Sequence, residues 1–312
     1  MKHFIKFENL ALAEKLINQA KEYKKNPLIN KELGSGKILG LLFFNPSLRT
    51  RLSTYKAAKN LGIDVVILSA GNDSWQIETE SGTIMNGAKA EHIKDAINMF
   101  NNYCDLIGIR CFPELKNQIK DYREEIINNF LKYSKIPVIN LESSTLHPLQ
   151  SLADMITINE EKKSTPKLGL CWAEHIKALP QSVANSFAQW SLGLNYELHI
   201  FQPQGFELSE EFTKGAIIHN NLNELNKMDF IYFKNWSSYK EYGKIGPNDN
   251  KWQVKLKDIG SAKIMHCLPV RRNLEVFDEL LDSENSLINQ QAENRIYATQ
   301  SVLSYLLENG KN

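Results

Sequence analysis

Eight short apolar segments, rich in β-branched and aromatic residues, recur along this chain and are separated mostly by stretches of helical periodicity. Such segments predict buried β-strands. They cover residues 37–44, 63–68, 105–110, 137–141, 167–172, 196–201, 229–233 and 263–268. Helices are predicted between them, for example over 52–62, 92–103 and 120–134. Strands that alternate with helices form parallel sheets covered on both faces, so the chain is predicted to adopt an α/β fold.

The length of the chain favours two domains. Eight strands in 312 residues suit two doubly wound sheets of about four strands each better than one large sheet. Residues 147–163 have the pattern of a long helix that crosses from one sheet to the next, and 295–309 form a final amphipathic helix. We therefore predict a first domain over 1–146, a second over 147–294, and a C-terminal helix, 295–312, that packs back on the first domain.

Charge and cysteine usage argue against several classes of protein. The formal net charge is +1, which gives no global attraction to nucleic acid or to an anionic membrane. The four cysteines have no CxxC spacing, which disfavours a zinc site and a disulfide framework. Residues 1–17 carry charges throughout and lack the apolar core of a signal peptide. A cytoplasmic location is expected.

A polar segment directly follows the first apolar run. Residues 43–54 read FFNPSLRTRLST, in which Ser47 is a candidate N-cap for the next helix. Ligands of doubly wound folds bind at the carboxyl ends of the strands, and unpaired N–H groups at a helix start attract anions. The hydroxyl groups and Arg49 add hydrogen bonds suited to phosphate. By itself, the segment is equally compatible with an ordinary capped helix whose arginines are solvated.

Two other segments place polar groups just after predicted strands. His147 and Gln150 begin the long crossing helix, and Cys267 and Leu268 lie at the end of the last apolar run. Taken singly, His147 is more often a structural capping residue, and Cys267 is more often a small buried apolar side chain. No GxGxxG or GxxxxGK[ST] pattern follows a strand, which disfavours a nucleotide-dependent dehydrogenase and an ATP or GTP site.

Together, three motifs resemble those of the aspartate/ornithine carbamoyltransferase superfamily: S-x-R-T-R at 47–51, H-P-x-Q at 147–150, and H-C-L-P with a following arginine at 266–271. The resemblance implies a first domain that binds carbamoyl phosphate, a second that binds the acceptor, and no metal or other cofactor. The catalytic residues that it implies are Thr50, Arg110, His147, Gln150 and Cys267. The carbamoyl-phosphate contacts that it implies are Ser47, Leu48, Arg49, Thr50, Trp75, Arg110, His147, Gln150, Cys267, Leu268 and Arg295.

The roles implied for these residues fit the chemistry of carbamoyl transfer. Charge develops on the carbonyl oxygen and on the departing phosphate, so positioned donors should dominate catalysis. By resemblance, Arg110 reaches both groups and His147 donates to the carbonyl oxygen with help from Thr50. Gln150 and the backbone carbonyls at Cys267 and Leu268 hold the carbamoyl NH2 group.

The acceptor half departs from the ornithine and aspartate enzymes. Ornithine carbamoyltransferases carry D-x-x-x-S-M-G, whereas residues 233–243 have Lys234 at the aspartate position and no SMG. A cation repels a free α-ammonium group but can pair with an α-carboxylate. Residues 71–87 bear Trp75 instead of the lysine-bearing loop of the aspartate enzymes. These features resemble the N-acylornithine carbamoyltransferases, in which the tryptophan loop enters the neighbouring subunit's site, so a homotrimer is implied.

The same resemblance implies acylornithine contacts at Glu142, His175, Lys177, Lys234, Ala90 and Leu268. Ala90 aligns with a residue that is proline in succinyl-type and glutamate in acetyl-type enzymes, and it lacks the acidic group that would repel a succinyl carboxylate. The expected reaction moves the carbamoyl group to the δ-amine of N-succinyl-L-ornithine, giving N-succinyl-L-citrulline and phosphate in arginine biosynthesis. N-acetylornithine, free ornithine as acceptor, and a non-catalytic anion-binding protein on the same fold are the alternatives.

Overall fold

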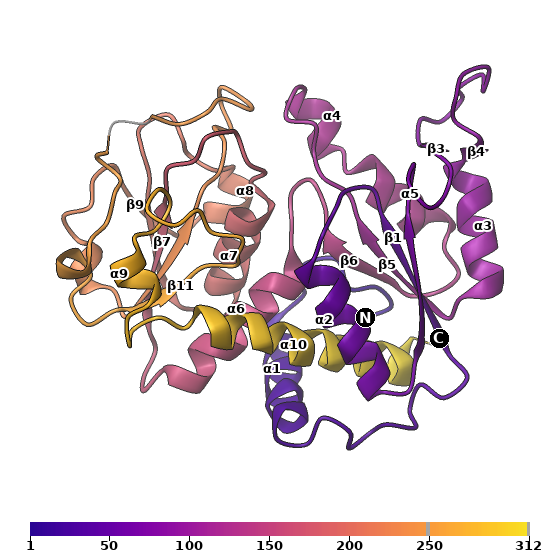
Figure 1. Cartoon of the computed structure of the whole chain (residues 1–312), viewed down its shortest axis with the longest axis horizontal. Helices are drawn as coiled ribbons and strands as arrows, with labels where there is room; N and C mark the ends of the chain where they lie inside the picture. Colours follow the sequence, from indigo (N-terminus) through magenta and orange to yellow (C-terminus); the bar gives the residue numbers. More distant parts are fainter. Residues whose placement is uncertain (248–249, 311–312) are drawn as a thin grey trace.

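Two parallel α/β domains make up the computed structural model, which describes residues 1–247 and 250–310 (Figure 1). The sheet of the first domain has the strand order β2-β1-β5-β6, and all its neighbouring strands are parallel. These strands are β1 (Ile38–Phe43), β2 (Asp64–Ser69), β5 (Leu106–Arg110) and β6 (Val138–Glu142). The central strands are buried on both faces, which explains their continuous apolar sequences.

The second domain has a five-stranded parallel sheet in the order β11-β10-β7-β8-β9. Its strands are β7 (Lys167–Trp172), β8 (Glu197–Phe201), β9 (Ile217–His219), β10 (Phe230–Lys234) and β11 (Lys263–Met265). All eight predicted segments therefore form strands. The additional edge strand β9 was not predicted, because it has three residues and none of them is buried.

Helices cover the faces of both sheets and join the two domains. The longer helices are α1 (Leu10–Lys25), α2 (Arg49–Asn60), α3 (Ile93–Tyr103), α5 (Glu125–Tyr133), α6 (Pro148–Glu161), α7 (Ser182–Gly193) and α10 (Ile288–Asn309). The shorter elements are β3 (Ile77–Glu78), β4 (Glu91–His92), α4 (Gln118–Tyr122), α8 (Glu210–Thr213) and α9 (Asp278–Leu281). No helix within 1–247 and 250–310 is both long and apolar enough to cross a membrane.

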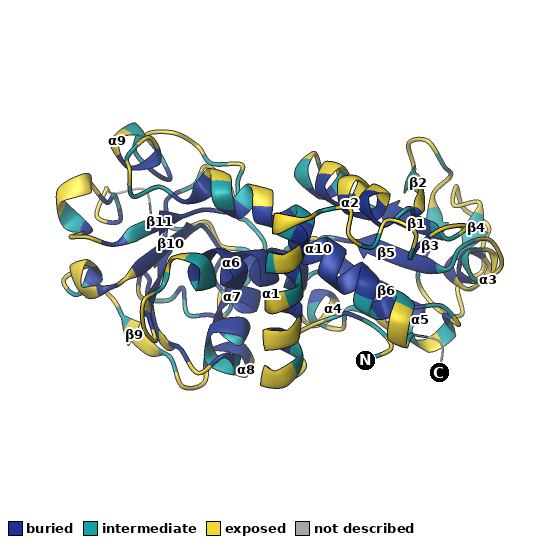
Figure 2. Cartoon of the chain, turned by 90° about the horizontal axis from the view of Figure 1, so that it is seen from below, coloured by how far each residue is buried: buried dark blue, intermediate teal, exposed yellow. Residues whose placement is uncertain are grey.

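The predicted crossing helix corresponds to α6, which lies between the two sheets and is buried along most of its length (Figure 2). The C-terminal helix α10 returns along α6 to α2 and α1, as predicted (Figure 1). It begins at Ile288, earlier than the predicted start at Arg295. The first turns of α10 were missed because Gln291 and Asn294 are polar but buried, and they pair with polar groups of α6. Residues 311–312 of the predicted helix lie outside the described residues.

The prediction of one helix over 120–134 was wrong, because two helices, α4 and α5, occupy this region. They are separated at Glu124, whose φ of 48° lies in the left-handed region. The half-buried Glu124 carboxylate accepts hydrogen bonds from the Ser143 hydroxyl at 2.6 Å and from the Thr145 N–H at 2.7 Å. The break between the helices thus fixes the loop that leads from β6 to the start of α6.

Candidate active site

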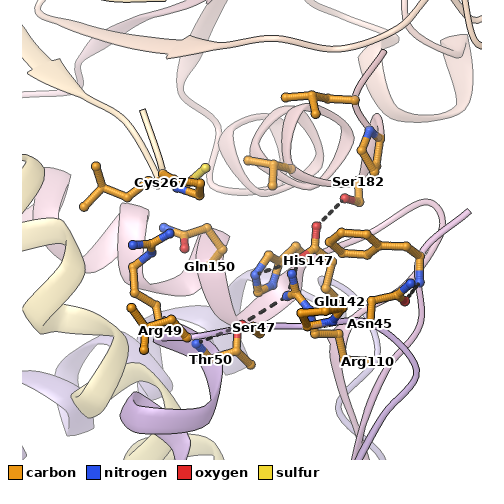
Figure 3. Close-up of a pocket in the computed structure, with 18 of the residues that line it drawn as sticks. Asn45, Ser47, Arg49, Thr50, Arg110, Glu142, His147, Gln150, Ser182 and Cys267 are labelled. Carbon is orange, nitrogen blue, oxygen red and sulfur yellow. Dashed lines mark hydrogen bonds and ion pairs between the residues drawn. The ribbon is translucent and has the colours of Figure 1, made fainter. Parts of the chain in front are cut away.

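A cleft of about 780 Å³ lies between the two domains, at the carboxyl ends of their strands (Figure 3). Parallel strands direct the segments that follow them to one edge of a sheet, so residues far apart in sequence meet there. The first domain contributes residues 43–51, Arg110 and Glu142, and the start of α6 contributes His147 and Gln150. The second domain contributes His175, Lys177, Lys234, Cys267, Leu268, Arg271 and Glu275, and α10 contributes Arg295.

Two buried arginines converge on the hydroxyl group of Thr50. Arg110 Nη1 donates to Thr50 Oγ1 at 3.3 Å, and Arg295 Nη2 donates to the same oxygen at 2.9 Å. Arg295 Nη1 also donates to Gln150 Oε1 at 2.9 Å. Burial and the neighbouring Arg110 lower the pKa of Arg295 to about 10, so the Arg295 guanidinium group remains charged at neutral pH. This concentration of positive charge favours an anionic ligand.

Several buried nitrogen atoms of this cluster have no partner within the part of the chain that the structure describes. The buried atoms are Arg110 Nε, Arg295 Nε and His147 Nδ1. Unsatisfied buried donors are costly, and oxygen atoms of a bound phosphate or carbonyl group would satisfy them. Ser47 lies at the adjacent start of α2, where its hydroxyl oxygen accepts the Thr50 N–H at 3.3 Å. The prediction of Ser47 as N-cap was wrong by one residue, because α2 begins at Arg49 and Leu48 occupies the N-cap position. The Ser47 hydroxyl group still satisfies one N–H group of the first turn.

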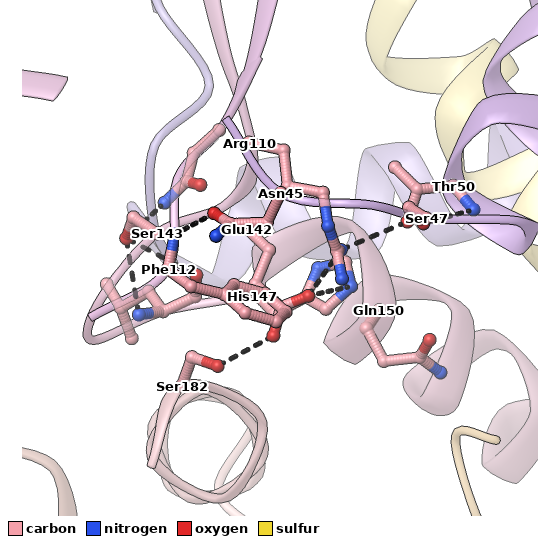
Figure 4. Close-up of polar contacts among 12 residues, drawn as sticks. Asn45, Ser47, Thr50, Arg110, Phe112, Glu142, Ser143, His147, Gln150 and Ser182 are labelled. Carbon is pink, nitrogen blue, oxygen red and sulfur yellow. Dashed lines mark hydrogen bonds and ion pairs between the residues drawn. The ribbon is translucent and has the colours of Figure 1, made fainter. Parts of the chain in front are cut away.

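Glu142 lies between Arg110 and His147 (Figure 4). Its carboxylate forms an ion pair with Arg110, lies 3.5 Å from His147 Nε2, and accepts a hydrogen bond from the Ser182 hydroxyl at 2.8 Å. Burial, followed by the charges of Arg295 and Arg110, holds the pKa of His147 well below its usual value. His147 is therefore neutral at physiological pH, and one ring N–H is available as a donor.

The segment after β11 presents its backbone to the cleft. Leu268 has a φ of 57°, which is rare for a residue with a branched side chain, and its N–H donates to His266 Nδ1 at 2.9 Å. Burial raises the pKa of the Cys267 thiol, so this side chain stays protonated at neutral pH and is a poor nucleophile. At Cys267 and Leu268 we expect the backbone carbonyl groups, and not the side chains, to bind the carbamoyl NH2 group.

The wall that the second domain contributes is rich in cations. Lys234 ends β10 and is 8% exposed, and its ammonium group makes no hydrogen bond or ion pair with any residue in 1–247 or 250–310. His175 Nε2 accepts a hydrogen bond from Arg271 Nε at 3.1 Å. Lys177 lies on the same wall. A ligand with carboxylate groups would compensate these charges.

Trp75 and Ala90 lie outside the cleft of their own chain. Both belong to the loop between β2 and α3, which Figure 1 shows extending from the outer side of the first domain. Trp75 is 59% exposed, and its indole Nε1 donates to Glu91 Oε2 at 2.6 Å. Ala90 is also exposed. The structure of one chain therefore brings every other predicted site residue to the cleft, but not these two.

Three polar residues that the second domain contributes to the cleft were not predicted as contacts: Ser182, Arg271 and Glu275. On the first domain, Asn45, Arg51, Ser69 and Asn72 were also missed. Arg271 is the arginine that follows the H-C-L-P motif, so the motif itself carried a signal for it. Ser182 lies in the same segment as His175 and Lys177, but a serine at this position predicts only the start of a helix. Nothing in the sequence near Glu275 marks it as a cleft residue, because its position depends on the turn after β11.

Comparison with known proteins identifies the family. Residues 2–160 match the family model described as aspartate/ornithine carbamoyltransferase, carbamoyl-P binding domain, and residues 179–306 match the Asp/Orn binding domain. The chain belongs to the aspartate/ornithine carbamoyltransferase family. This carbamoyltransferase is 43% identical to the N-succinylornithine carbamoyltransferase of Bacteroides fragilis (strain 638R), over 99% of each chain. It is 32% identical to the N-acetylornithine carbamoyltransferase of Xanthomonas campestris pv. campestris, over 98% of each.

Solved structures agree with this relationship. A mutant N-acetyl-L-ornithine transcarbamylase complexed with carbamyl phosphate and N-succinyl-L-norvaline superposes with a TM-score of 0.92 and 31% identity, covering 98% of this chain and all of the other. Acetylornithine transcarbamylase complexed with acetylcitrulline gives a TM-score of 0.91 at 30% identity, covering 98% and 99%. The predicted fold, family and enzyme class of this carbamoyltransferase are confirmed.

No metal site accompanies the cleft in the region described. No group of three or more His, Cys, Asp or Glu side chains in 1–247 and 250–310 is placed to hold a metal ion.

Proposed function

We propose that this carbamoyltransferase transfers the carbamoyl group from carbamoyl phosphate to the δ-amine of N-succinyl-L-ornithine, giving N-succinyl-L-citrulline and phosphate in arginine biosynthesis. The observation that carries the proposal is the 42–43% identity, over essentially the full length, to N-succinylornithine carbamoyltransferases of two Bacteroides species. The N-acetylornithine enzymes are more distant, at 31–32%.

We assign the phosphate to the α2 start and the buried arginines. Ser47, Leu48, Arg49 and Thr50 surround it from the helix start, and Arg295 binds it from α10. Arg110, His147 and Thr50 donate to the carbonyl oxygen, where negative charge develops. The unpartnered nitrogen atoms of Arg110, Arg295 and His147 support this assignment. Gln150 and the carbonyl groups at Cys267 and Leu268 accept from the carbamoyl NH2 group.

The reaction follows from this arrangement. The neutral δ-amine attacks the carbonyl carbon, a C–N bond forms, and the C–O bond to phosphate breaks. An alkyl ammonium group has a pKa of about 10.4, so the δ-ammonium group must first release a proton to solvent to give the neutral amine. After attack, the same nitrogen atom loses a second proton, which the departing phosphate accepts. Because His147 is itself neutral, it donates its N–H to the carbonyl oxygen without adding a positive charge to the site.

The acylornithine lies against the second domain in this proposal. Lys234, with His175 and Lys177 beside it, binds carboxylate groups, and Glu142 and Leu268 contact the substrate near the reacting amine. Lys234 is a buried residue whose ammonium group has no partner among the described residues, and this supports the assignment. Accordingly, residues 1–146 form the carbamoyl-phosphate domain, 147–294 the acylornithine domain, and 295–312 the returning helix. The cysteine usage is that of a cytoplasmic enzyme.

The acceptor is tested by measuring citrulline-type product from carbamoyl phosphate with N-succinylornithine, N-acetylornithine and free ornithine side by side. We expect turnover of the succinyl compound, and a marked loss of it in Ala90→Glu, because a new carboxylate would repel the succinyl group. The matched control is Ala90→Gln, which has nearly the same size without the charge. Preference for N-acetylornithine would overturn the assignment of Ala90, and turnover of ornithine alone would overturn the acylornithine proposal.

We further propose a homotrimer in which Trp75 and Ala90 of each chain complete the cleft of a neighbour. Their exposure and their distance from the cleft of their own chain support this arrangement. Mixing two inactive variants, Trp75→Ala and Arg110→Ala, should then restore part of the activity, because some mixed clefts receive an intact Arg110 and an intact Trp75. Failure to restore activity in mixtures that exchange subunits would contradict the shared site.

A further inference from the structure

A buried carboxyl group, Asp154, lies beneath the cleft without lining it. It belongs to α6, one turn after Gln150, and is 0% exposed. No ion pair satisfies it among the described residues. Both of its short contacts are made by amide groups, and they share the oxygen atom Oδ1. A carboxyl group is expensive to bury in this way, which raises the question of what it contributes.

The first contact orients a residue of the site. Gln150 Nε2 donates to Asp154 Oδ1 at 2.7 Å, while Gln150 Oε1 accepts from Arg295 at 2.9 Å. Burial raises the pKa of Asp154 to about 7, but Oδ1 accepts hydrogen bonds in both contacts. An accepting oxygen at this place selects the amide orientation in which the NH2 group of Gln150 points into the protein. The carbonyl oxygen of Gln150 is thereby turned toward Arg295 and the cleft, where it can accept from a carbamoyl NH2 group.

The second contact leads to the opposite wall of the cleft. Gln291 Nε2, on α10, donates to Asp154 Oδ1 at 2.7 Å, and Gln291 Oε1 accepts the His266 N–H at 2.9 Å. His266 Nδ1 in turn accepts the Leu268 N–H at 2.9 Å. This series of hydrogen bonds reaches the residue with the left-handed backbone, whose carbonyl group we assign to the carbamoyl subsite.

We propose that Asp154 is a positioning residue for carbamoyl transfer, because its carboxyl oxygen sets the orientation of Gln150 on one wall of the cleft and, through Gln291 and His266, of the 267–268 backbone on the other. The proposal rests on the proposed function, since it concerns the site that holds the carbamoyl NH2 group. Gln150 and the 267–268 backbone come from opposite sides of the cleft, so a shared support under both keeps their acceptor atoms at a fixed separation. Small errors in such geometry are costly to catalysis.

The surroundings of Asp154 suit this role better than a purely structural one. The groups that face it are Gln150 on α6, Gln291 and Arg295 on α10, Tyr232 on β10, and Cys267 after β11. The Tyr232 hydroxyl group interacts with the Asp154 carboxyl group, but neither that hydroxyl group nor Asp154 Oδ2 forms a hydrogen bond of good geometry within the described residues. Stability alone would favour a less polar residue here. All the neighbours of Asp154 belong to elements that meet at the carbamoyl subsite.

The test compares Asp154→Leu and Asp154→Asn with the unmodified enzyme. Leucine has a similar size but accepts no hydrogen bond, and we expect kcat for carbamoyl transfer to fall about 10²-fold. Asparagine keeps one acceptor oxygen and should recover most of that loss. The affinity for inorganic phosphate, measured by calorimetry, should change much less than kcat in both variants. Among the described residues, Arg110 and the start of α2 make no hydrogen bond or ion pair with Asp154, and only Arg295 is linked to it, through Gln150.

A matched control is Thr157→Val, one turn further along α6. It removes a hydrogen bond between α6 and α10, from Asn294 Nδ2 to Thr157 Oγ1 at 2.9 Å, without touching the series that leads to the cleft. Its kcat should match that of the unmodified enzyme. Equal losses in Thr157→Val and Asp154→Leu, or a kcat for folded Asp154→Leu within about threefold of normal, would overturn the proposal.

A second variant keeps the proposal testable if Asp154→Leu does not fold. Gln291→Met removes the link to His266 but leaves the Gln150 contact, and we expect a loss of about tenfold in kcat with unchanged phosphate affinity. Unchanged kcat in Gln291→Met would contradict the second half of the series. If the unmodified enzyme turns over none of the three acceptors, the proposed function fails. If it is active and these variants are too, only the role of Asp154 fails.

Discussion

Arg110→Ala should lower kcat for carbamoyl transfer by about 10²- to 10³-fold, a loss of about 3 kcal/mol or more in transition-state stabilisation. Arg110 is buried, donates to Thr50, and has an unpartnered Nε atom at the position assigned to the carbonyl oxygen and phosphate. Its guanidinium group also lies over the Phe112 ring, 4.4 Å from the centroid, which restricts its orientation. Steady-state kinetics with saturating carbamoyl phosphate measures the effect.

Stability must be separated from catalysis in this variant. Removing Arg110 leaves the Glu142 carboxylate buried without its cation, which costs about 3–5 kcal/mol in comparable cases. Adding Glu142→Gln should restore most of the unfolding free energy, measured with urea, but none of the activity. Turnover at the normal rate in folded Arg110→Ala would remove this residue from the mechanism.

Lys234→Met should raise the KM for N-succinylornithine by about 10²-fold, because it removes a desolvated cation that we pair with a substrate carboxylate. Methionine fills much of the same volume, so the fold around β10 should persist. The KM for carbamoyl phosphate should change little, since Lys234 lies on the opposite wall from the phosphate site. Both constants come from varying each substrate at saturating levels of the other.

Lys244→Met is the matched control. Lys244 is an exposed lysine in the loop after the same strand, and its ammonium group pairs only with Glu241 among the described residues. Its replacement should leave both KM values unchanged. An unchanged KM for N-succinylornithine in Lys234→Met would show that Lys234 does not face a substrate carboxylate, and the argument against free ornithine would lose its basis.

The strand segments were predictable because central strands of a parallel sheet are buried on both faces and need uninterrupted apolar sequences. The site residues at strand ends could also be predicted from the sequence, because a residue that follows a parallel strand lies at the carboxyl edge of its sheet. Thr50, Arg110, His147 and Lys234 meet in one cleft on this basis. The three motifs together indicated the family, which the patterns of strands and helices alone had not identified.

The sequence patterns failed to predict helix bounds at places where polar side chains, and not apolar ones, make the tertiary contacts. The early turns of α10 carry Gln291 and Asn294, which are buried through hydrogen bonds to α6 rather than through the hydrophobic effect. Glu124 interrupts a region of helical pattern because its carboxylate binds the loop before His147. Such residues look like solvated positions in a sequence, since a pattern of polarity does not reveal a partner far along the chain.

The sequence by itself determined the parallel α/β architecture, the family and most of the residues that surround the cleft, because these depend on local periodicity and on short motifs at strand ends. Only the tertiary structure decided that Arg110 and Arg295 share the Thr50 hydroxyl group, that Glu142 lies between Arg110 and His147, and that Asp154 joins both walls from below. These arrangements depend on how α6 and α10 pack between the two sheets. Contacts of this kind are fixed by long-range packing, which no local pattern encodes.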